Sequence, residues 1–128
     1  MSKSVDDLLV EARSQIDRVT PQQAQHEVAR GAIIVDTRCL EDRRAEGAVP
    51  GSVHIPRTVL EWRADPASSD HDHRIADRDA RLIIMCNDGY SSSLAAAGLK
   101  RMGFARVADL IGGYRGWVGT GLPTEPVP

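Results

Sequence analysis

Residues 81–100, RLIIMCNDGYSSSLAAAGLK, decide the fold predicted for this chain. The apolar run from Leu82 to Met85 is typical of a strand buried on both faces, and the helix formers that begin near Ser91 predict a helix. Between them, Asn87 to Tyr90 form a short loop that contains a glycine. The stretch therefore predicts a strand, a tight turn and a helix, with Cys86 where the strand meets the turn.

Outward from this unit, segments of strand and helix character alternate about five times. The strand-like segments lie within DRVT (17–20), AIIVDTR (32–38), GSVHIP (51–56), RLIIMC (81–86) and ARVADLIGG (105–113). This alternation predicts an α/β fold in which helices cover both faces of a parallel sheet. Ligands of such sheets bind beyond the carboxyl ends of the strands, and Cys86 is expected at one of those ends.

The segments at the two ends of the chain are expected to lie outside this sheet. The apolar spacing of SVDDLLVEARSQI predicts a helical arm over residues 1–16. Thr20 and Pro21 then predict the N-cap and first position of the next helix. The tail, residues 123–128, is expected to be frayed.

Length, composition and charge predict one globular domain. A chain of 128 residues with 41% hydrophobic and 27% charged residues fits a single core, and a net charge of −2 argues against nonspecific binding to nucleic acid or membranes. The opening MSKSVDDLLV lacks the features of a secretory signal, so we expect a cytoplasmic protein. Two cysteines, Cys39 and Cys86, are too few for a disulfide scaffold or a four-cysteine zinc site.

The position of Cys86 predicts a reactive thiol. Cysteine reacts as the thiolate, and the N–H groups at a helix N-terminus lower the pKa of a nearby thiol. Gly89 permits a turn with positive φ, which lets the N–H groups of residues 87–92 point inward. Such a loop can hold an oxyanion, or a sulfur anion carried on the cysteine.

Two enzyme classes use this arrangement, and one residue separates them. Phosphatases with a cysteine nucleophile need an arginine six positions after it, to grip the phosphate oxygens. Here that position is Ser92, and the next arginine is Arg101. Phosphate or arsenate chemistry is therefore disfavoured, and the pattern favours transfer of a sulfur atom through a persulfide on Cys86.

Three segments of the sequence resemble the rhodanese family of thiosulfate sulfurtransferases. IIVDTR with EGAVPGSVHIP is similar to the family's first signature, CNDGYSS resembles its active loop, and VADLIGGYRGW resembles its closing strand and helix. The likeness covers residues 17–122, which we take as the rhodanese-like domain. It implies a sheet of five parallel strands, with helices on both faces.

The resemblance also implies the site and its partners. Cys86 would carry the persulfide, and the loop Asn87, Asp88, Gly89, Tyr90, Ser91 and Ser92 would bind it, without metal or organic cofactor. The donor would be thiosulfate or a persulfide or polysulfide, and the acceptor a thiol, cyanide or a protein. Many active members of the family carry Arg or Lys in this loop, whereas Asp88 is expected to repel a dianion such as thiosulfate.

Several other residues near the predicted strand ends are weaker candidates. We expect Asp36 and Arg38 to form an internal ion pair rather than to act in catalysis. Arg57, Trp62 and Arg63 follow the third strand and are candidates for a cationic pocket rim, with a solvated surface the equal or better interpretation. Cys39 is interpreted as an incidental loop cysteine in preference to a resolving thiol.

The remaining polar motifs favour structural roles. His71, Asp72 and His73 suggest metal ligands, but adjacent side chains in a polar loop rarely converge on one ion, so no metal site is predicted. At least one serine of residues 91–93 is expected to cap the helix, with Ser91 or Ser92 the better candidates for the pocket. The alternative function is a rhodanese-like binding or redox-sensing module with weak or no turnover.

Overall fold

The computed structural model describes all residues from 1 to 128, and it confirms an α/β fold with five parallel strands. The strands are β1 (Asp17–Val19), β2 (Ile33–Asp36), β3 (Val53–His54), β4 (Leu82–Met85) and β5 (Ala108–Leu110). The helices are α1 (Val5–Arg13), α2 (Pro21–Val28), α3 (Leu40–Glu46), α4 (Leu60–Ala64), α5 (Ser91–Arg101) and α6 (Gly113–Gly119), with a 3₁₀ turn η1 (Arg57–Val59) before α4.

The strand order β1-β5-β4-β2-β3 places β4 at the centre of the sheet. Its neighbour β2 is in register with it, so that Asp36 pairs with Met85 and the Thr37 N–H donates to the Met85 carbonyl at 2.9 Å. Because parallel strands end at the same edge, Cys86 emerges beside the residues that follow β2. β3 lies at the sheet edge, separated from β4 by β2.

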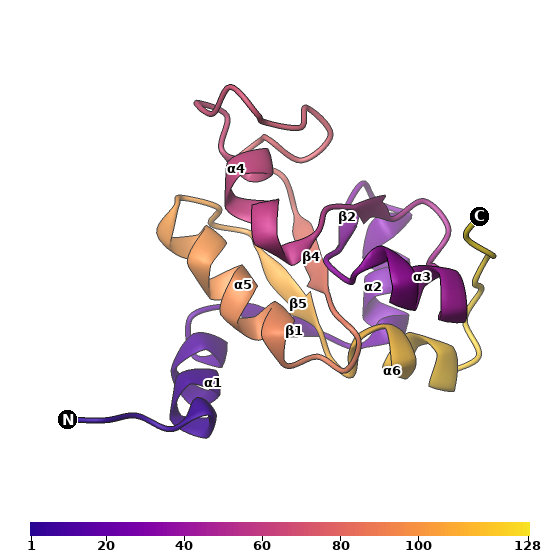
Figure 1. The fold of residues 1–128 in the computed structure, drawn as a ribbon, viewed down its shortest axis with the longest axis horizontal. Helices are drawn as coiled ribbons and strands as arrows, with labels where there is room; N and C mark the ends of the chain where they lie inside the picture. The colour runs from indigo at the N-terminus through magenta and orange to yellow at the C-terminus, as the bar shows by residue number, and fades with distance from the viewer.

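Alternate residues of β4 supply the two cores on either side of the sheet. Leu82 and Ile84 face the core under α4 and α5, whereas Ile83 and Met85 face the core under α2 and α6. All four side chains are fully buried, as the uninterrupted apolar run predicts. Figure 1 shows these helices flanking the sheet.

The first two helices each begin with a capping box, and the cap at Thr20 is the one that the sequence predicts. Thr20 caps α2 by accepting from the Gln23 N–H, with Pro21 at the first helical position. Ser4 and Asp7 form the same reciprocal capping box at α1. α1 then packs against α5, so the arm lies on the helix that begins next to Cys86.

The C-terminal tail, which we expected to be frayed, makes specific contacts in the structure. The backbones of Ala48 and Glu125 exchange two hydrogen bonds of 2.9 Å, and the Trp117 indole N–H donates to the Pro123 carbonyl at 2.8 Å. Composition alone could not reveal a partner for this segment. The division into an arm (1–16), a domain (17–122) and a tail (123–128) stays a prediction.

None of the helices is both long enough and apolar enough to span a membrane. The polar stretch from Ala67 to Ala80 forms turns without a helix, and it is held to the body by the fully buried side chain of Ile75.

Candidate active site

Cys86 follows the last residue of β4, and its sulfur lies inside the loop that leads to α5. The backbone N–H of Gly89 donates to the Cys86 Sγ at 3.2 Å, and that of Ser92 donates at 3.4 Å. Only 8% of the residue is exposed. The loop predicted from the sequence therefore surrounds the sulfur with N–H donors, which is the arrangement that stabilises a sulfur anion.

Opposing effects act on the pKa of the Cys86 thiol. Burial raises it, whereas hydrogen bonds from the hydroxyls of Ser92 and Ser91 and from the backbone N–H groups of Ser92 and Gly89 lower it. The hydrogen bonds prevail, and the pKa lies below the ordinary value for cysteine. The thiolate of Cys86 is therefore more populated at a given pH than that of an ordinary cysteine.

The pH dependence of alkylation tests this statement. Because the pKa of Cys86 is lowered, its reaction with iodoacetamide is expected to rise with pH and to level off at a lower pH than the reaction of an ordinary thiol. The measurement uses Cys39→Ser, so that Cys86 is the only thiol. A profile that coincides with that of an ordinary thiol would contradict the lowered pKa.

Two glycines allow the loop and α6 to approach closely. Gly89 has φ +88°, and a Cβ there would lie 2.8 Å from the Gly112 nitrogen. At Gly113, with φ +62°, a Cβ would lie 2.5 Å from the Cys86 carbonyl oxygen. The close approach lets the Tyr114 N–H donate to that carbonyl at 2.8 Å. α6 therefore supports the Cys86 backbone from behind.

The serines of the loop do not cap α5, which corrects the sequence-based expectation. Tyr90 occupies the N-cap position and makes no side-chain capping bond. The Ser92 and Ser93 hydroxyls are directed at the fully buried carboxylate of Asp109, at 3.1 and 2.7 Å. Because a hydroxyl has one proton, Ser92 can donate to Asp109 or to the sulfur, but not to both at once.

Cys86 opens into a shallow hollow of about 390 Å³ at the carboxyl ends of β2 and β4. The residues that line it are Thr37, Arg38, Cys39, Asp42, Cys86, Asn87, Asp88, Tyr90 and Ser91. Cys39 is exposed there, on the same rim as Cys86. Asp42 accepts a hydrogen bond from the Asn87 amide at 3.0 Å, and bonds from Asn87 and Cys39 lower the pKa of its carboxyl.

Asp88 is exposed on this rim, but its charge is partly offset. Arg115 Nη1 lies 2.8 Å from the Asp88 carboxylate, and its other nitrogens bind Glu46 at 3.0 and 3.2 Å. About half of the Asp88 side chain is accessible, so solvent weakens the ion pair. The hollow therefore carries less negative charge than the loop sequence alone suggests.

The sequence of this chain matches the model of a known protein family. The model named Rhodanese-like domain matches residues 20–120, most of the sequence. The chain belongs to the rhodanese-like domain family. The resemblance of its three segments to that family is thereby confirmed.

Relatives of this rhodanese-like domain include named sulfurtransferases. The thiosulfate sulfurtransferase GlpE of Ectopseudomonas mendocina is 39% identical over 113 residues, which is 88% of this chain and 93% of that protein. The GlpE protein of Pseudomonas fluorescens Pf-5 is 37% identical over 112 residues, again 88% and 93%. Both matches extend over nearly the full length of both proteins.

Among solved structures, a protein of unknown function from Rhodopseudomonas palustris, described as a possible tyrosine phosphatase, has a TM-score of 0.88 and 30% identity. The match covers 98% of this chain and 96% of that one. The polysulfide-sulfur transferase homodimer of Wolinella succinogenes has a TM-score of 0.75 at 18% identity, covering 93% and 85%. At 18% identity, the likeness to the Wolinella succinogenes protein shows only that the two proteins share a fold.

The rhodanese-like domain contains the ion pair expected between Asp36 and Arg38. Arg38 Nη2 lies 2.9 Å from the Asp36 carboxylate, and both side chains are fully buried. Arg43 binds the same carboxylate, and the Arg38 guanidinium lies 3.8 Å from the centre of the Tyr114 ring. The pair fixes the end of β2, directly beside the hollow.

The three residues that were candidates for a cationic rim do not line this hollow. Arg57 binds Glu61 at 3.0 Å, Arg63 donates to the Asp70 carbonyl at 2.9 Å, and Trp62 is 59% exposed. They follow the edge strand β3, and none of them is among the residues that line the hollow. The structure also contains no group of three His, Cys, Asp or Glu side chains that could hold a metal.

Several residues around the loop were not predicted from the sequence. Arg13, Arg18 and Asp109 meet at the rear of the loop, and Asp42 and Arg115 lie at its front. Arg13 and Arg18 are far from Cys86 in sequence, and their approach depends on the position of α1 and on the pairing of β1 with β5. No local motif marks them.

Proposed function

We propose that this rhodanese-like domain is a sulfurtransferase that moves a sulfane sulfur through a persulfide on Cys86. The observation that carries the proposal is the cradle of the Gly89 and Ser92 N–H groups around the Cys86 sulfur. A cradle of this kind stabilises the thiolate before reaction and the terminal sulfur anion of a persulfide after it. Asn87 to Ser92 form the binding loop in this proposal.

The reaction has two halves, which balance without an added oxidant. The Cys86 thiolate attacks the outer sulfur of the donor, a new S–S bond forms, and the donor's S–S bond breaks. With thiosulfate, sulfite leaves with the electron pair. A thiophilic acceptor then attacks the outer sulfur of the persulfide and restores the thiolate. With cyanide as acceptor the product is thiocyanate.

The names of the full-length relatives support the reaction class, since the GlpE proteins are called thiosulfate sulfurtransferases. Polysulfide is a second class of donor in this proposal, because it also carries a sulfane sulfur that a thiolate can attack. We propose a small sulfur donor and a thiol, cyanide or protein acceptor as partners, with no nucleic acid, membrane, metal or organic cofactor involved. We place the protein in the cytoplasm, where a free thiol is kept reduced.

Steady-state kinetics test the proposal. Thiocyanate production is measured while thiosulfate and cyanide, and then polysulfide and cyanide, are varied together. A persulfide intermediate predicts ping-pong kinetics, with parallel lines in double-reciprocal plots. Thiocyanate production no faster than the uncatalysed reaction, with both donors, would remove the enzyme proposal and leave the binding or redox-sensing module as the working hypothesis.

Asp88→Asn is expected to raise the rate with thiosulfate by about 2- to 5-fold at low salt, because it removes a negative charge from the rim beside Arg115, which stays paired with Glu46. The gain is expected to shrink as salt increases. Asp79→Asn is the control, since Asp79 is an exposed carboxylate that does not line the hollow. An equal rate for both variants at low salt would exclude electrostatic repulsion by Asp88.

Phosphatase activity is a second candidate only because of the relative described as a possible tyrosine phosphatase. Ser92 stands at the position of the phosphate-gripping arginine, and its hydroxyl is directed at Asp109. We therefore expect no hydrolysis of p-nitrophenyl phosphate above the rate of Cys86→Ser. Cysteine-dependent hydrolysis of this ester would favour the phosphatase.

A further inference from the structure

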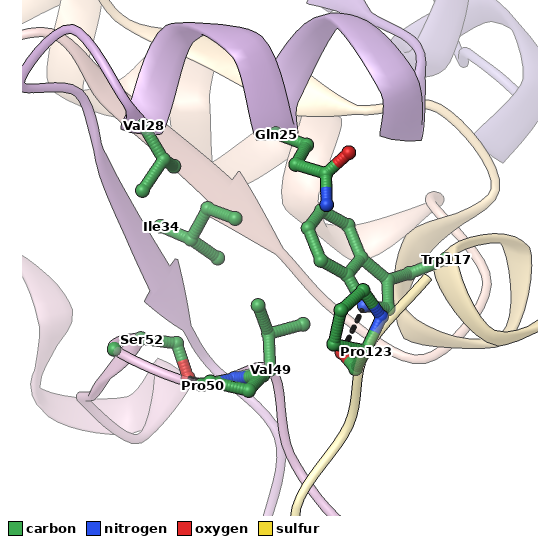
Figure 2. A pocket seen from close by; sticks show the side chains of 9 residues that line it. Gln25, Val28, Ile34, Val49, Pro50, Ser52, Trp117 and Pro123 are labelled. Atoms are coloured by element: carbon green, nitrogen blue, oxygen red, sulfur yellow. Dashed lines mark hydrogen bonds between the residues drawn. The ribbon is translucent and has the colours of Figure 1, made fainter. Parts of the chain in front are cut away.

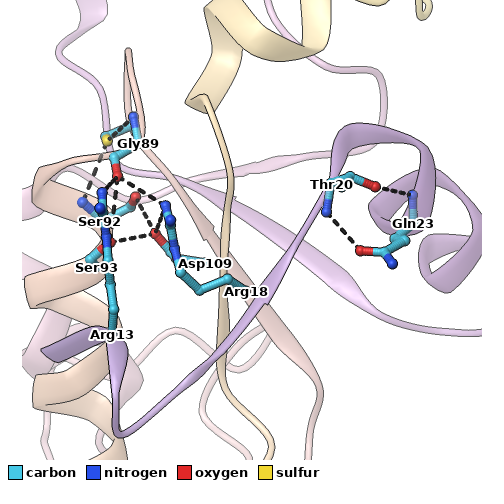
Figure 3. Close-up of polar contacts among 9 residues, drawn as sticks. Arg13, Arg18, Thr20, Gln23, Gly89, Ser92, Ser93 and Asp109 are labelled. Atoms are coloured by element: carbon cyan, nitrogen blue, oxygen red, sulfur yellow. Dashed lines mark hydrogen bonds and ion pairs between the residues drawn. The ribbon is translucent and has the colours of Figure 1, made fainter. Parts of the chain in front are cut away.

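The rear of the sulfur-binding loop is held by two arginines from outside it. The Gly89 carbonyl accepts hydrogen bonds from Arg13 Nη2 at 2.9 Å and from Arg18 Nη2 at 3.3 Å. The N–H of the same glycine donates to the Cys86 sulfur at 3.2 Å. Gly89 is therefore fixed on one side by the arginines and directed at the sulfur on the other. Figure 3 shows these contacts converging on one point.

Arg13 also reaches the start of α5. Its Nε donates to the Ser93 hydroxyl at 3.0 Å, and that hydroxyl in turn donates to Asp109 at 2.7 Å. Arg18 closes the ring through its Nε, which binds Asp109 at 2.9 Å. One planar guanidinium from α1 thus binds both the loop, at Gly89, and the helix that follows it, at Ser93.

Arg13 differs from the other cations near Cys86 because it has no acidic partner. The charged and titratable groups around the loop and the hollow are Arg13, Arg18, Asp109, Arg38, Cys39, Asp42, Asp88, Tyr90 and Arg115. Arg18 is paired with Asp109, Arg38 with Asp36, and Arg115 with Asp88. Arg13 takes part in none of the ion pairs of the structure.

We propose that Arg13 is a positioning residue of this site, through which the N-terminal helix α1 holds Gly89 against the sulfur and supplies a positive charge behind the loop. The inference rests on the proposed role of Cys86 as a thiolate nucleophile. Residue 13 lies before the part of the chain that the family model matches, which begins at residue 20. The arm thereby supplies the cation that the loop itself lacks.

Arg13 acts on the Cys86 thiol through its charge and through its hydrogen bonds to the loop. A positive charge near a partly buried thiol favours the thiolate, and the low polarity of the surroundings strengthens the effect. The Arg13 side chain is only partly exposed. Its guanidinium carbon lies 6.0 Å from the centre of the Tyr90 ring, over the loop. Removal of its charge should therefore disfavour the thiolate, and removal of its hydrogen bonds should loosen the Gly89 N–H.

The test measures the pKa of Cys86 by the pH dependence of iodoacetamide alkylation, in the full chain carrying Cys39→Ser. Arg13→Gln is compared with Lys3→Gln, which removes the same charge from the same arm at an exposed ion pair with Glu11. We expect Arg13→Gln to raise the pKa by about half a unit or more and to slow alkylation at pH 7 by about 3-fold, with no change in Lys3→Gln. Equal pKa values for the two variants would overturn the inference.

Arg13→Lys and a sulfur-uptake measurement complete the experiment. The lysine keeps the charge and is expected to recover half or more of the pKa change; no recovery would contradict the role of the charge. A merely structural role would lower the melting temperature without moving the pKa. If the wild type takes up no sulfur while Arg13→Gln still raises the pKa, the proposed function fails and the role of Arg13 stands. If the wild type transfers sulfur and Arg13→Gln titrates like it, only the inference about Arg13 fails.

Discussion

Replacing Cys86 with serine is expected to reduce thiocyanate production by at least about 1000-fold, because a hydroxyl cannot accept and release a sulfane sulfur as a thiolate does. The variant should fold normally, since serine is close to cysteine in size and the N–H groups of Gly89 and Ser92 retain an acceptor. The circular dichroism spectrum and melting temperature check this. The rate is measured with both thiosulfate and polysulfide as donors.

Cys39→Ser is the matched control for this prediction. Cys39 lines the same hollow and is more exposed than Cys86, but no N–H cradle surrounds its sulfur. Its replacement is expected to leave the rate within about 2-fold of the wild type. A large loss of rate in Cys39→Ser together with a small loss of rate in Cys86→Ser would show that Cys39, and not Cys86, is the nucleophile.

Replacing Asp36 with alanine is expected to lower the free energy of unfolding by about 3–5 kcal/mol, because it leaves a buried positive charge without its partner. The Arg38 side chain is fully buried, and its Nη1 already lacks a hydrogen-bond partner. Arg43 would lose the same carboxylate. Urea unfolding measures the change.

Glu11→Ala provides the comparison, since Glu11 forms an exposed ion pair with Lys3 and its loss should leave the unfolding free energy nearly unchanged. Asp36→Asn keeps one acceptor oxygen and should lie between wild type and Asp36→Ala, which keeps the test usable if the alanine variant does not fold. Unfolding curves for Asp36→Ala and Glu11→Ala that coincide would show that the buried pair contributes little.

An apolar pocket lies away from the hollow that contains Cys86, on the face of the sheet covered by α2 and α6. Its volume is about 160 Å³, and its lining includes Val28, Ile34, Val49 and Trp117. Figure 2 shows these side chains around the space, with the Trp117 indole bound to the Pro123 carbonyl. None of the residues that line it belongs to the sulfur-binding loop, so the proposed chemistry makes no use of it.

The central unit of the fold could be predicted because its signals are local. The apolar run of β4, the glycine in the loop and the helix formers of α5 are adjacent in sequence, and each has one strong structural preference. Thr20 and Pro21 mark a helix start for the same reason. Asp36 and Arg38 are two residues apart at a strand end, so their pairing needed no knowledge of the sheet order.

The rest of the site depends on the order of the strands, which local patterns do not specify. β1 pairs with β5, which brings Arg18 to Asp109, and α1 packs on α5, which brings Arg13 to Gly89. At least one serine of residues 91–93 was expected to cap α5 because of its place at the helix start, whereas the partner that Ser93 and Ser92 bind, Asp109, is 16 and 17 residues away. Arg57, Trp62 and Arg63 were candidates for a cationic rim, with a solvated surface the equal or better interpretation, and none of the three lines the hollow.

Sulfur transfer through Cys86 is best tested by mass spectrometry of the intact wild-type protein after exposure to thiosulfate or polysulfide, without reductant. We predict a gain of one sulfur atom, which peptide fragmentation locates on Cys86 and which cyanide removes as thiocyanate. Cys86→Ser should gain none. No added sulfur from either donor, or added sulfur found only on Cys39, would contradict transfer through Cys86.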